Sequence, residues 1–256
     1  MIDKLAFVHP TAKIGNNVTI GPWTYIGENV EIGDDTWISS HVVVKGPTVI
    51  GKGNRIFQFS SVGEECQDKK YAGEQTRLII GDNNIIRESV TIHRGTTQDK
   101  GETRIGSNCL FMAYVHIAHD CFVGNKVIMA NNASIAGHVH VGDWVILGGM
   151  TGVHQFVHIG AHAFTAGASL ILQDVPPFVM AAGSPAVPRG LNLEGLKRRG
   201  FTKESQRAIL SAYKAVFRKS LTIEEANAEL IEAAEKDINV KAFMEFINHS
   251  ARGIIR

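Results

Sequence analysis

Two histidines and an aspartate stand inside an apolar run, "YVHIAHDCFVG", at residues 114–124. His116, His119 and Asp120 are residue types that bind metal ions, and a histidine beside a carboxylate is also the arrangement of a general base with its orienting partner. Plain packing is a third interpretation. The choice between these interpretations depends on where the backbone directs the three side chains.

Composition excludes several classes of protein. The 256 residues are 44% hydrophobic and 20% charged with a net charge of +1, which is typical of a globular protein and argues against binding nucleic acid over the whole surface. The sequence lacks an export signal and any apolar stretch of about 18 residues, so we expect no membrane span and a cytoplasmic location. The 3 cysteines lack metal-binding spacing, which predicts buried thiols.

A six-residue repeat organises most of the chain. Apolar residues recur at every sixth position over residues 14–62, 80–92 and 105–171, with insertions at 63–77 and 93–104. A period of six fits neither a helix nor a simple strand. Each hexapeptide is therefore predicted to form a short strand and a corner, with one apolar side chain facing a continuous core.

Helical signals replace the repeat near the C-terminus. Apolar residues at helical spacing in 207–217, a capping box from Thr222 to Glu225 and an apolar run at 240–247 predict three helices. We predict a β-helix over residues 1–188, with an inserted loop near 63–79, and an α-helical domain over 189–256. Such a small domain is expected to pack against the β-helix or a neighbouring subunit.

Stacked coils would gather polar groups at one edge. If a coil takes 18 residues, His119, Gly137 and Gln155 lie about 4.8 Å apart in one column. A histidine, a backbone N–H at a glycine and a side-chain amide are what acyl transfer needs: a base, an oxyanion donor and a positioning group. Because a convex edge makes no pocket, we predict a homotrimer that closes clefts between chains.

A zinc enzyme is the main alternative at this edge. Of the 11 histidines, 7 fall between His116 and His162, and a hexapeptide-repeat enzyme with zinc held by three histidines would resemble the gamma-type carbonic anhydrases. Histidines on outward corners are equally compatible with hydrogen bonds at a trimer interface. We predict no bound metal.

Longer motifs point to one family. The repeat resembles that of the hexapeptide-repeat acyltransferases, whose fold is a left-handed parallel β-helix. "AFVHPTA", "QDKKYAGE", "RESVTIHRGT", "HIAHDC", "GGMTGVHQF", "QDVPPFV" and "GLKRRGF" resemble, in order and spacing, the UDP-N-acetylglucosamine O-acyltransferases of lipid A synthesis. The resemblance implies transfer of a (R)-3-hydroxyacyl chain from acyl carrier protein to the glucosamine 3-hydroxyl of UDP-N-acetylglucosamine. No cofactor is implied beyond the phosphopantetheine of the carrier protein.

The resemblance also assigns roles to residues. It implies that His119 is the general base, that Asp120 supports its imidazole and that the Gly137 N–H is the oxyanion donor. The positions implied to assist catalysis or to bind substrate, together with Gln155 from the stacking argument, are Gln67, Asp68, Lys70, His93, His116, His138 and His154. The positions implied to bind the nucleotide are Asn192, Glu194, Arg198 and Arg199.

Acyl-chain length and carrier docking follow from the same resemblance. The family measures its acyl chain at the position of Gly167, where glycine leaves the groove long, and this implies about fourteen carbons. Phe164 and Pro185 depart from the family pattern and would reshape the groove. A basic stretch over residues 197–219 fits the docking of an acidic carrier protein.

Three further functions are possible, and one sequence feature distinguishes each of them from the acyltransferase interpretation. A sibling enzyme that N-acylates a glucosamine derivative carries a uridine-binding domain before its repeats, whereas the hexapeptides here begin by Ile14. A coenzyme A-dependent acetyltransferase would not need the nucleotide-end motif or a long acyl groove. A non-catalytic trimeric scaffold would make the His119, Gly137 and Gln155 column accidental.

Overall fold

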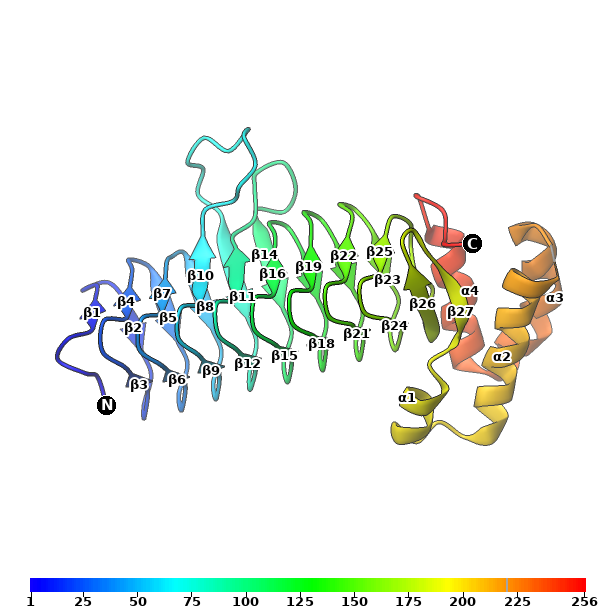
Figure 1. The fold of residues 1–256 in the computed structure, drawn as a ribbon, viewed down its shortest axis with the longest axis horizontal. Helices are drawn as coiled ribbons and strands as arrows, with labels where there is room; N and C mark the ends of the chain where they lie inside the picture. The colour runs from blue at the N-terminus through cyan, green and yellow to red at the C-terminus, as the bar shows by residue number, and fades with distance from the viewer. Residues whose placement is uncertain (220) are drawn as a thin grey trace.

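Short strands wind into a three-sided prism. The computed structural model describes residues 1–219 and 221–256, and in these residues each coil gives one strand to each of three sheets (Figure 1). Strands of successive coils pair in parallel and join residues 18 apart, as in His116↔Ser134↔Gly152. This confirms the predicted left-handed parallel β-helix with a small helical C-terminal part.

The chain enters the three sheets in a fixed order. The first sheet consists of β1 (Phe7–Val8), β4 (Tyr25–Ile26), β7 (Val43–Val44), β10 (Ser61–Glu64), β13 (Thr91–His93), β16 (His116–Ile117), β19 (Ser134–Ile135), β22 (Gly152–Val153) and β25 (Leu170–Ile171). The second consists of β2 (Lys13–Ile14), β5 (Val30–Ile32), β8 (Thr48–Ile50), β11 (Arg77–Ile80), β14 (Glu102–Ile105), β17 (Phe122–Val123), β20 (His140–Val141) and β23 (His158–Ile159). The third consists of β3 (Thr19–Ile20), β6 (Trp37–Ile38), β9 (Arg55–Ile56), β12 (Ile85–Ile86), β15 (Leu110–Phe111), β18 (Ile128–Met129), β21 (Ile146–Leu147), β24 (Phe164–Thr165), β26 (Val179–Gly183) and β27 (Ala186–Leu191).

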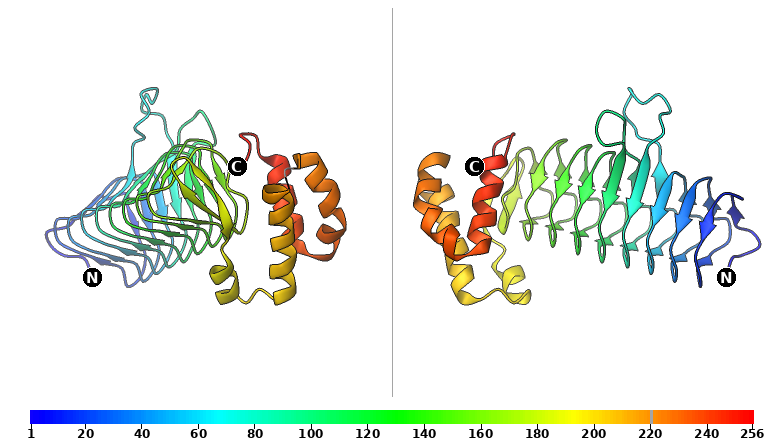
Figure 2. Two further views of the ribbon diagram at one scale, coloured as in Figure 1. Left: turned by 45° about the vertical axis from the view of Figure 1, so that its right-hand side comes forward. Right: turned by 180° about the vertical axis from the view of Figure 1, so that it is seen from behind.

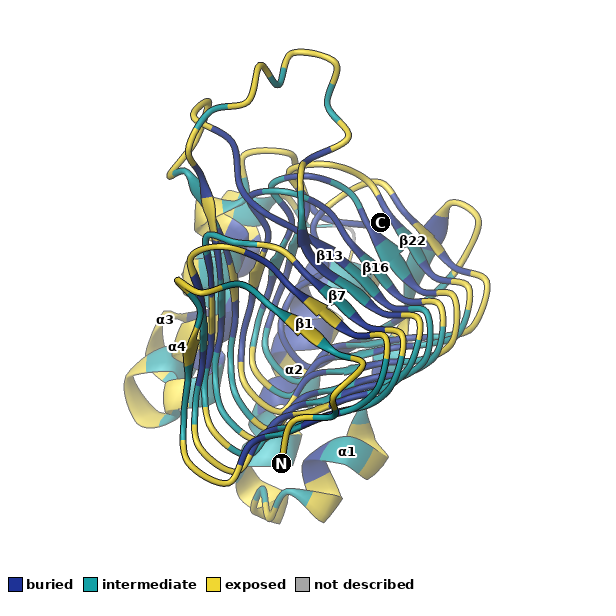
Figure 3. Cartoon of the chain, turned by 90° about the vertical axis from the view of Figure 1, so that its left-hand side faces the viewer, coloured by how far each residue is buried: buried dark blue, intermediate teal, exposed yellow. Residues whose placement is uncertain are grey.

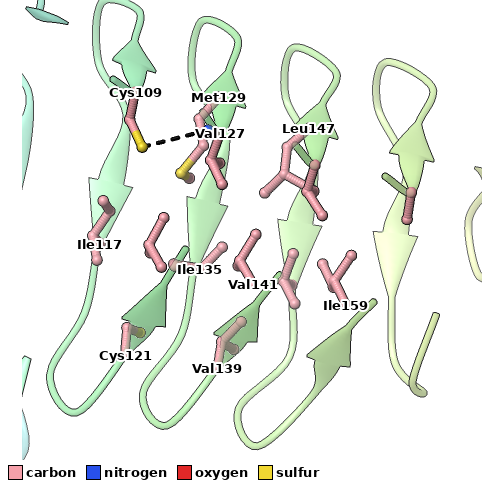
Figure 4. Packing of buried hydrophobic residues seen from close by; sticks show 14 of the residues in the cluster. Cys109, Ile117, Cys121, Val127, Met129, Ile135, Val139, Val141, Leu147 and Ile159 are labelled. Atoms are coloured by element: carbon pink, nitrogen blue, oxygen red, sulfur yellow. Dashed lines mark hydrogen bonds between the residues drawn. The ribbon is translucent and has the colours of Figure 1, made fainter. Parts of the chain in front are cut away.

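The core is a stack of branched apolar side chains. Viewed along the axis, the inward residues of the walls are buried and the corners are exposed (Figure 3). Ile117 and Ile135 come from successive coils and lie in the same inward column (Figure 4). The three cysteines are free and buried, as predicted, and the Cys109 sulfur accepts a hydrogen bond from the Val127 N–H at 3.4 Å. Continuous apolar burial therefore holds the coils together.

The corners turn through a left-handed backbone conformation. Asp120, His138 and Phe156 occupy equivalent corners of successive coils, with φ values of 58°, 61° and 64°. This conformation costs a residue with a Cβ about 1–2 kcal/mol. The hydrogen bonds and packing between coils must offset that cost at every turn, so these corners are rigid supports for their side chains.

Two longer loops leave the prism at one edge, where the first sheet leads into the second (Figures 1 and 2). The first loop, residues 65–76, joins β10 to β11, and the second loop, residues 94–101, joins β13 to β14. Both fall within the interruptions of the repeat. Buried Arg94 connects them, because its guanidinium donates to the Gly63 carbonyl at 2.8 Å and to the Tyr71 hydroxyl at 3.2 Å.

The end of the β-helix carries an antiparallel hairpin and a helical tail. β26 pairs antiparallel with β27, so the predicted boundary at residue 188 lies inside a strand. The helices of the described tail are α1 (Leu193–Arg198), α2 (Lys203–Arg218), α3 (Ile223–Lys236) and α4 (Ile238–His249). The capping box from Thr222 to Glu225 is confirmed at the start of α3. The sequence patterns missed α1, which is short.

The chain then returns to the last coil. Ser250 donates to the buried Asp174 carboxylate at 2.7 Å, and the Ile255 N–H donates to the Asp174 carbonyl at 3.0 Å. These bonds close the open end of the core. Within residues 1–219 and 221–256, no helix combines the length and the apolar character needed to cross a membrane.

We expect Phe111→Ala to lower the free energy of unfolding by about 3–5 kcal/mol, because the ring is fully buried and its loss leaves a cavity. The matched control is Phe59→Ala, whose ring is 62% exposed and whose loss should cost less than about 1 kcal/mol. Urea unfolding of both variants measures the difference. Equal losses of unfolding free energy in the two variants would contradict the role of Phe111 in the core.

Candidate active site

A cleft of about 490 Å³ lies along the edge that carries the two loops. Its floor is the outer face of the first sheet, where Ser134 has a small side chain and Gly152 has none. The candidate residues that line it are Gln67, Asp68, His93, His116, His119, Gly137, His154 and Gln155. The cleft is mostly apolar but contains these polar groups, which suits a ligand with an apolar and a polar part.

His119, Gly137 and Gln155 stack as the 18-residue coil predicts. The His138 N–H donates to the His119 carbonyl, and the Phe156 N–H donates to the Gly137 carbonyl, each at 3.1 Å. A Cβ on Gly137 would lie 2.6 Å from Nε2 of His119, so glycine is required there to leave room for the imidazole. Among the described residues the Gly137 N–H is paired with no acceptor, which leaves it free to bind a ligand oxygen.

His119 and Asp120 form a hydrogen-bonded pair. Nδ1 of His119 lies 2.8 Å from Oδ2 of Asp120, and the Asp120 side chain is almost fully buried. Burial alone would raise the pKa of Asp120, but hydrogen bonds from His119 and Thr96 outweigh it, so the pKa lies below its ordinary value. The carboxylate is therefore ionised at neutral pH. It fixes the proton of His119 on Nδ1 and leaves Nε2 as the basic nitrogen.

The second loop supports this pair from behind. Thr96 donates to both carboxylate oxygens of Asp120, through its N–H at 2.8 Å and its hydroxyl at 2.6 Å. Asp99 of the same loop lies 3.1 Å from Nδ1 of His138. His138 stacks on Phe156 and meets the His119 ring edge-on at 5.1 Å. His138 therefore flanks the pair, and its ring is held on two sides.

Two further histidines are held neutral at the sheet end of the cleft. Burial, followed by the charge of neighbouring His116, lowers the pKa of His93 to about 4. Burial, followed by the charge of His119, also lowers the pKa of His116. Thr91 lies 2.7 Å from Nδ1 of His116 and orients it. Neutral imidazoles can donate and accept hydrogen bonds, which suits contacts with hydroxyl groups.

The first loop brings Gln67 and Asp68 to the cleft, whereas Lys70 is exposed at its side. The Lys70 N–H donates to the Asp68 carboxylate at 2.9 Å, which shapes the turn. His154 and Gln155 close the opposite end, where Arg252 donates to the Gln155 carbonyl at 3.1 Å. The C-terminal tail thus holds that corner of the cleft.

His119, Asp120 and His138 also meet the spacing of a metal site. One ligand atom from each lies within 4.8 Å of the others. Both carboxylate oxygens of Asp120 already accept hydrogen bonds, and Nδ1 of His119 is one of the partners. A cation bound by all three residues would compete with these hydrogen bonds for the Asp120 oxygens.

The whole chain matches solved structures of one family. A UDP-N-acetylglucosamine acyltransferase of Francisella novicida is 46% identical over 100% of this chain and 94% of that chain, with a TM-score of 0.98. Its counterpart from Acinetobacter baumannii is 48% identical over 100% and 99%, with a TM-score of 0.97. The chain belongs to the UDP-N-acetylglucosamine acyltransferases. An Arabidopsis member is 38% identical over 100% of both chains, with a TM-score of 0.87.

Sequence models of families match both ends of the chain. Residues 174–255 match the model described as "Udp N-acetylglucosamine O-acyltransferase; Domain 2". Residues 2–102 match the model of the GMPPB C-terminal domain. The first of these models covers the end of the β-helix and the helical tail, whereas most of the residues that line the candidate cleft lie in the β-helix between the two matched ranges.

The four residues that resemble the family's nucleotide contacts lie elsewhere. Asn192, Glu194, Arg198 and Arg199 line a second cleft of about 680 Å³ beside α1 and the third sheet, together with Phe164. Figure 1 places α1 on the side of the prism opposite the two loops. One chain therefore does not bring the predicted sugar and nucleotide contacts together.

Contacts within the chain already engage some of the side chains that line the second cleft. The Asn192 amide caps α1 and donates to the His162 carbonyl at 3.0 Å. Arg198 pairs with Glu194 at 2.8 Å on the surface. Arg199 lies over the Trp144 ring, 5.0 Å from its centroid, and burial lowers its pKa. Arg198, whose side chain is 76% exposed, is thus more accessible to a phosphate than Arg199.

Gly167 lies at the edge where the third sheet leads into the first, on the far side of the first sheet from His119. A Cβ there would meet the Gly149 carbonyl at 3.4 Å, which is ordinary contact. A longer side chain therefore has open space in which to project. Pro185 lies in the exposed turn between β26 and β27.

The sequence patterns missed the residues that hold Asp120 and His138 in place. Thr96 and Asp99 lie in an insertion of irregular length, which breaks the 18-residue register, and Thr103 accepts the Asp120 N–H at 2.8 Å from the next strand. Within the sequence, the strongest available signal was a polar loop interrupting a regular repeat.

We expect acid to destabilise the fold through His93. Its folded pKa of about 4 lies below the unfolded value of 6.5, so only the unfolded chain gains a proton as pH falls from 6.5 to 4.5. His93→Gln should recover about 2 kcal/mol of the stability lost over that range. Urea unfolding at the two pH values measures this, with solvent-exposed His249→Gln as the control. An unchanged acid slope in His93→Gln would contradict the assignment.

Proposed function

We propose that the protein transfers a (R)-3-hydroxyacyl chain from acyl carrier protein to the glucosamine 3-hydroxyl of UDP-N-acetylglucosamine, in lipid A synthesis. The observation that carries this proposal is the hydrogen-bonded His119–Asp120 pair next to Gly137, in a mostly apolar cleft. Membership of the family supports the substrate, because the solved relatives are named for UDP-N-acetylglucosamine.

The pair can carry the whole proton cycle. Nε2 of His119 removes the proton of the sugar 3-hydroxyl as its oxygen attacks the thioester carbon of the acyl donor. The negative charge that develops on the former carbonyl oxygen is stabilised by the Gly137 N–H. Collapse of the intermediate breaks the C–S bond, and the imidazolium returns its proton to the leaving thiolate. Ionised Asp120 stabilises the imidazolium between these two transfers.

Neighbouring groups would position the sugar and the acyl head. Neutral His93 and His116 can bond sugar hydroxyls without competing for the proton. Gln67 and Asp68 face the cleft from the first loop, so we assign them to the sugar and the acyl 3-hydroxyl. His154 and Gln155 flank the acyl head at the other end. Lys70 and His138 do not line the cleft, and we assign them supporting roles in binding the substrate.

The acyl chain would run across the first sheet. Ser134 and Gly152 form a low floor that leads away from His119, and Gly167 leaves the far edge unobstructed. This supports a chain of about fourteen carbons, since a longer apolar slot holds a longer acyl group. Phe164 lines the other cleft of the same chain, so it bears on chain length only through a neighbouring subunit.

A homotrimer would complete the site. Residues Asn192, Glu194, Arg198 and Arg199 face away from the catalytic edge of their own chain. A cyclic assembly places the third sheet and α1 of one chain against the catalytic edge of the next, so that one substrate spans both. We assign the nucleotide to that shared cleft.

The acyl donor is proposed to dock through the basic stretch over residues 197–219, which carries eight Lys and Arg residues and one acid. Opposite charge accelerates encounter with an acidic carrier protein. The chemistry needs no resident cofactor or metal. We place the reaction in the cytoplasm, where free thiols such as those of the three cysteines persist.

We expect His119→Ala to lower kcat/KM for acyl transfer by roughly 10²–10⁴-fold, because it removes the general base. The assay supplies UDP-N-acetylglucosamine and (R)-3-hydroxyacyl carrier proteins of graded length, with a chelator present. Solvent-exposed His249→Gln is the control and should keep its turnover. Retained turnover in His119→Ala would remove the base assignment, and bicarbonate turnover that depends on added zinc would favour the carbonic anhydrase alternative.

We expect Gly167→Met to shift the preferred acyl chain to one about four carbons shorter, since its side chain would project into open space at the end of the groove. Competition between carrier proteins of ten to sixteen carbons measures the preference. Phe164→Ala is the comparison, because Phe164 lies in the other cleft. A shift in preferred chain length produced by Phe164→Ala and not by Gly167→Met would show that Phe164, rather than Gly167, determines acyl-chain length.

A further inference from the structure

The His119–Asp120 pair of the proposed mechanism is held by Thr96, which lies 24 positions before Asp120 in the sequence. Thr96 lies in the second loop and is 4% exposed, whereas Asp120 lies at a corner of the β-helix and is 5% exposed. The Thr96 hydroxyl donates to Oδ2 of Asp120 at 2.6 Å, and the same oxygen binds Nδ1 of His119 at 2.8 Å. One carboxylate oxygen therefore joins the loop to the base.

We propose that Thr96 is a positioning residue for acyl transfer, whose hydroxyl locks the Asp120 carboxylate in the orientation that keeps the proton of His119 on Nδ1. This inference rests on the proposed function of His119 as the base. Thr96 touches neither substrate nor the reacting atoms, and it acts through Asp120 alone. The second loop is thus part of the catalytic apparatus, although it lines little of the cleft.

The backbone of Asp120 is already fixed by other contacts, so the orientation of its carboxylate is what the Thr96 hydroxyl can determine. Its backbone takes a φ of 58°, and its N–H donates to the Thr103 hydroxyl at 2.8 Å. The Thr96 N–H holds Oδ1 at 2.8 Å. The Thr96 hydroxyl is the remaining donor that fixes Oδ2 without itself taking part in proton transfer.

Loss of the hydroxyl would leave the carboxylate less firmly held. The Thr96 N–H still holds Oδ1, but Oδ2 keeps only its contact with Nδ1 of His119 and can rotate away from it. His119 would then populate the tautomer that carries its proton on Nε2, which cannot accept a proton from the sugar. Asp99 lies 3.1 Å from Nδ1 of His138 and, as an acceptor, keeps the proton of that ring on Nδ1, so Nε2 of neutral His138, 3.9 Å from Oδ2, offers no donor that could hold the carboxylate instead.

The test compares kcat and KM for Thr96→Val, which removes the hydroxyl and keeps the shape, with those for Thr96→Ser, which keeps the hydroxyl. We expect kcat of Thr96→Val to fall by about 10–100-fold, the effect of losing a hydrogen bond to a charged group. KM for UDP-N-acetylglucosamine should stay within about twofold, because ground-state binding is untouched. Thr96→Ser should recover most of the lost kcat.

The matched control is Thr36→Val in an N-terminal coil. Thr36 is also buried, and its hydroxyl donates to the Gly51 carbonyl and accepts the Asn54 N–H. It should lose thermal stability comparable to that lost by Thr96→Val, with turnover unchanged. Equal effects of the two variants on kcat would show that Thr96 serves only the fold, and would overturn the proposal.

A double-mutant cycle supplies the second readout. In an Asp120→Ala background the Thr96→Val change should alter kcat by less than about twofold, because the hydroxyl has no carboxylate left to hold. An undiminished loss in that background, or a loss in Thr96→Ser as large as in Thr96→Val, would overturn the proposal. Should Thr96→Val not fold, Thr96→Ala is judged by the same criteria. Absence of acyl transfer by the wild type, or full turnover by His119→Ala, would instead count against the proposed function.

Discussion

The stacking of each coil on the last, through parallel backbone hydrogen bonds at a constant register, is the constraint on which the site depends. It brings His119, Gly137 and Gln155 together although each is 18 residues from the next. It also explains the glycine, since successive corners lie so close that a Cβ on Gly137 would overlap the imidazole of His119. The stacking of the coils therefore sets the spacing between the proposed base and the proposed oxyanion donor.

Electrostatics then separates the roles of similar residues. Asp120 is buried yet ionised, because three hydrogen bonds reach its two oxygens. His93 is buried and His116 is half-buried, neither has a carboxylate partner, and burial lowers the pKa of both. Of these three histidines, only His119 has a charged acceptor on Nδ1. That difference in partners, rather than in residue type, supports the proposal that His119 is the base.

The regular part of the molecule could be predicted from the sequence, and the irregular part could not. A six-residue period determines which side chains face inward and which residues stack, so the column of His119, Gly137 and Gln155 follows by counting. The insertion at residues 93–104 has no period. Its fold is set by tertiary contacts, such as those of Arg94 and Thr96, that no local pattern encodes. The short α1 was missed because its six residues are held by the Asn192 cap more than by helical periodicity.

The same regularity limits what one chain can do. A prism has flat faces and convex edges, so each cleft here is open and each holds part of the predicted substrate contacts. Loops raise one wall beside His119, while α1 and the hairpin raise another wall on a different side (Figure 1). A long substrate with a nucleotide at one end and a reactive hydroxyl at the other cannot reach both walls of the same prism. The proposed association of chains about an axis parallel to the prism would solve this problem without altering the coil, because it would place the wall of one chain opposite His119 of the next.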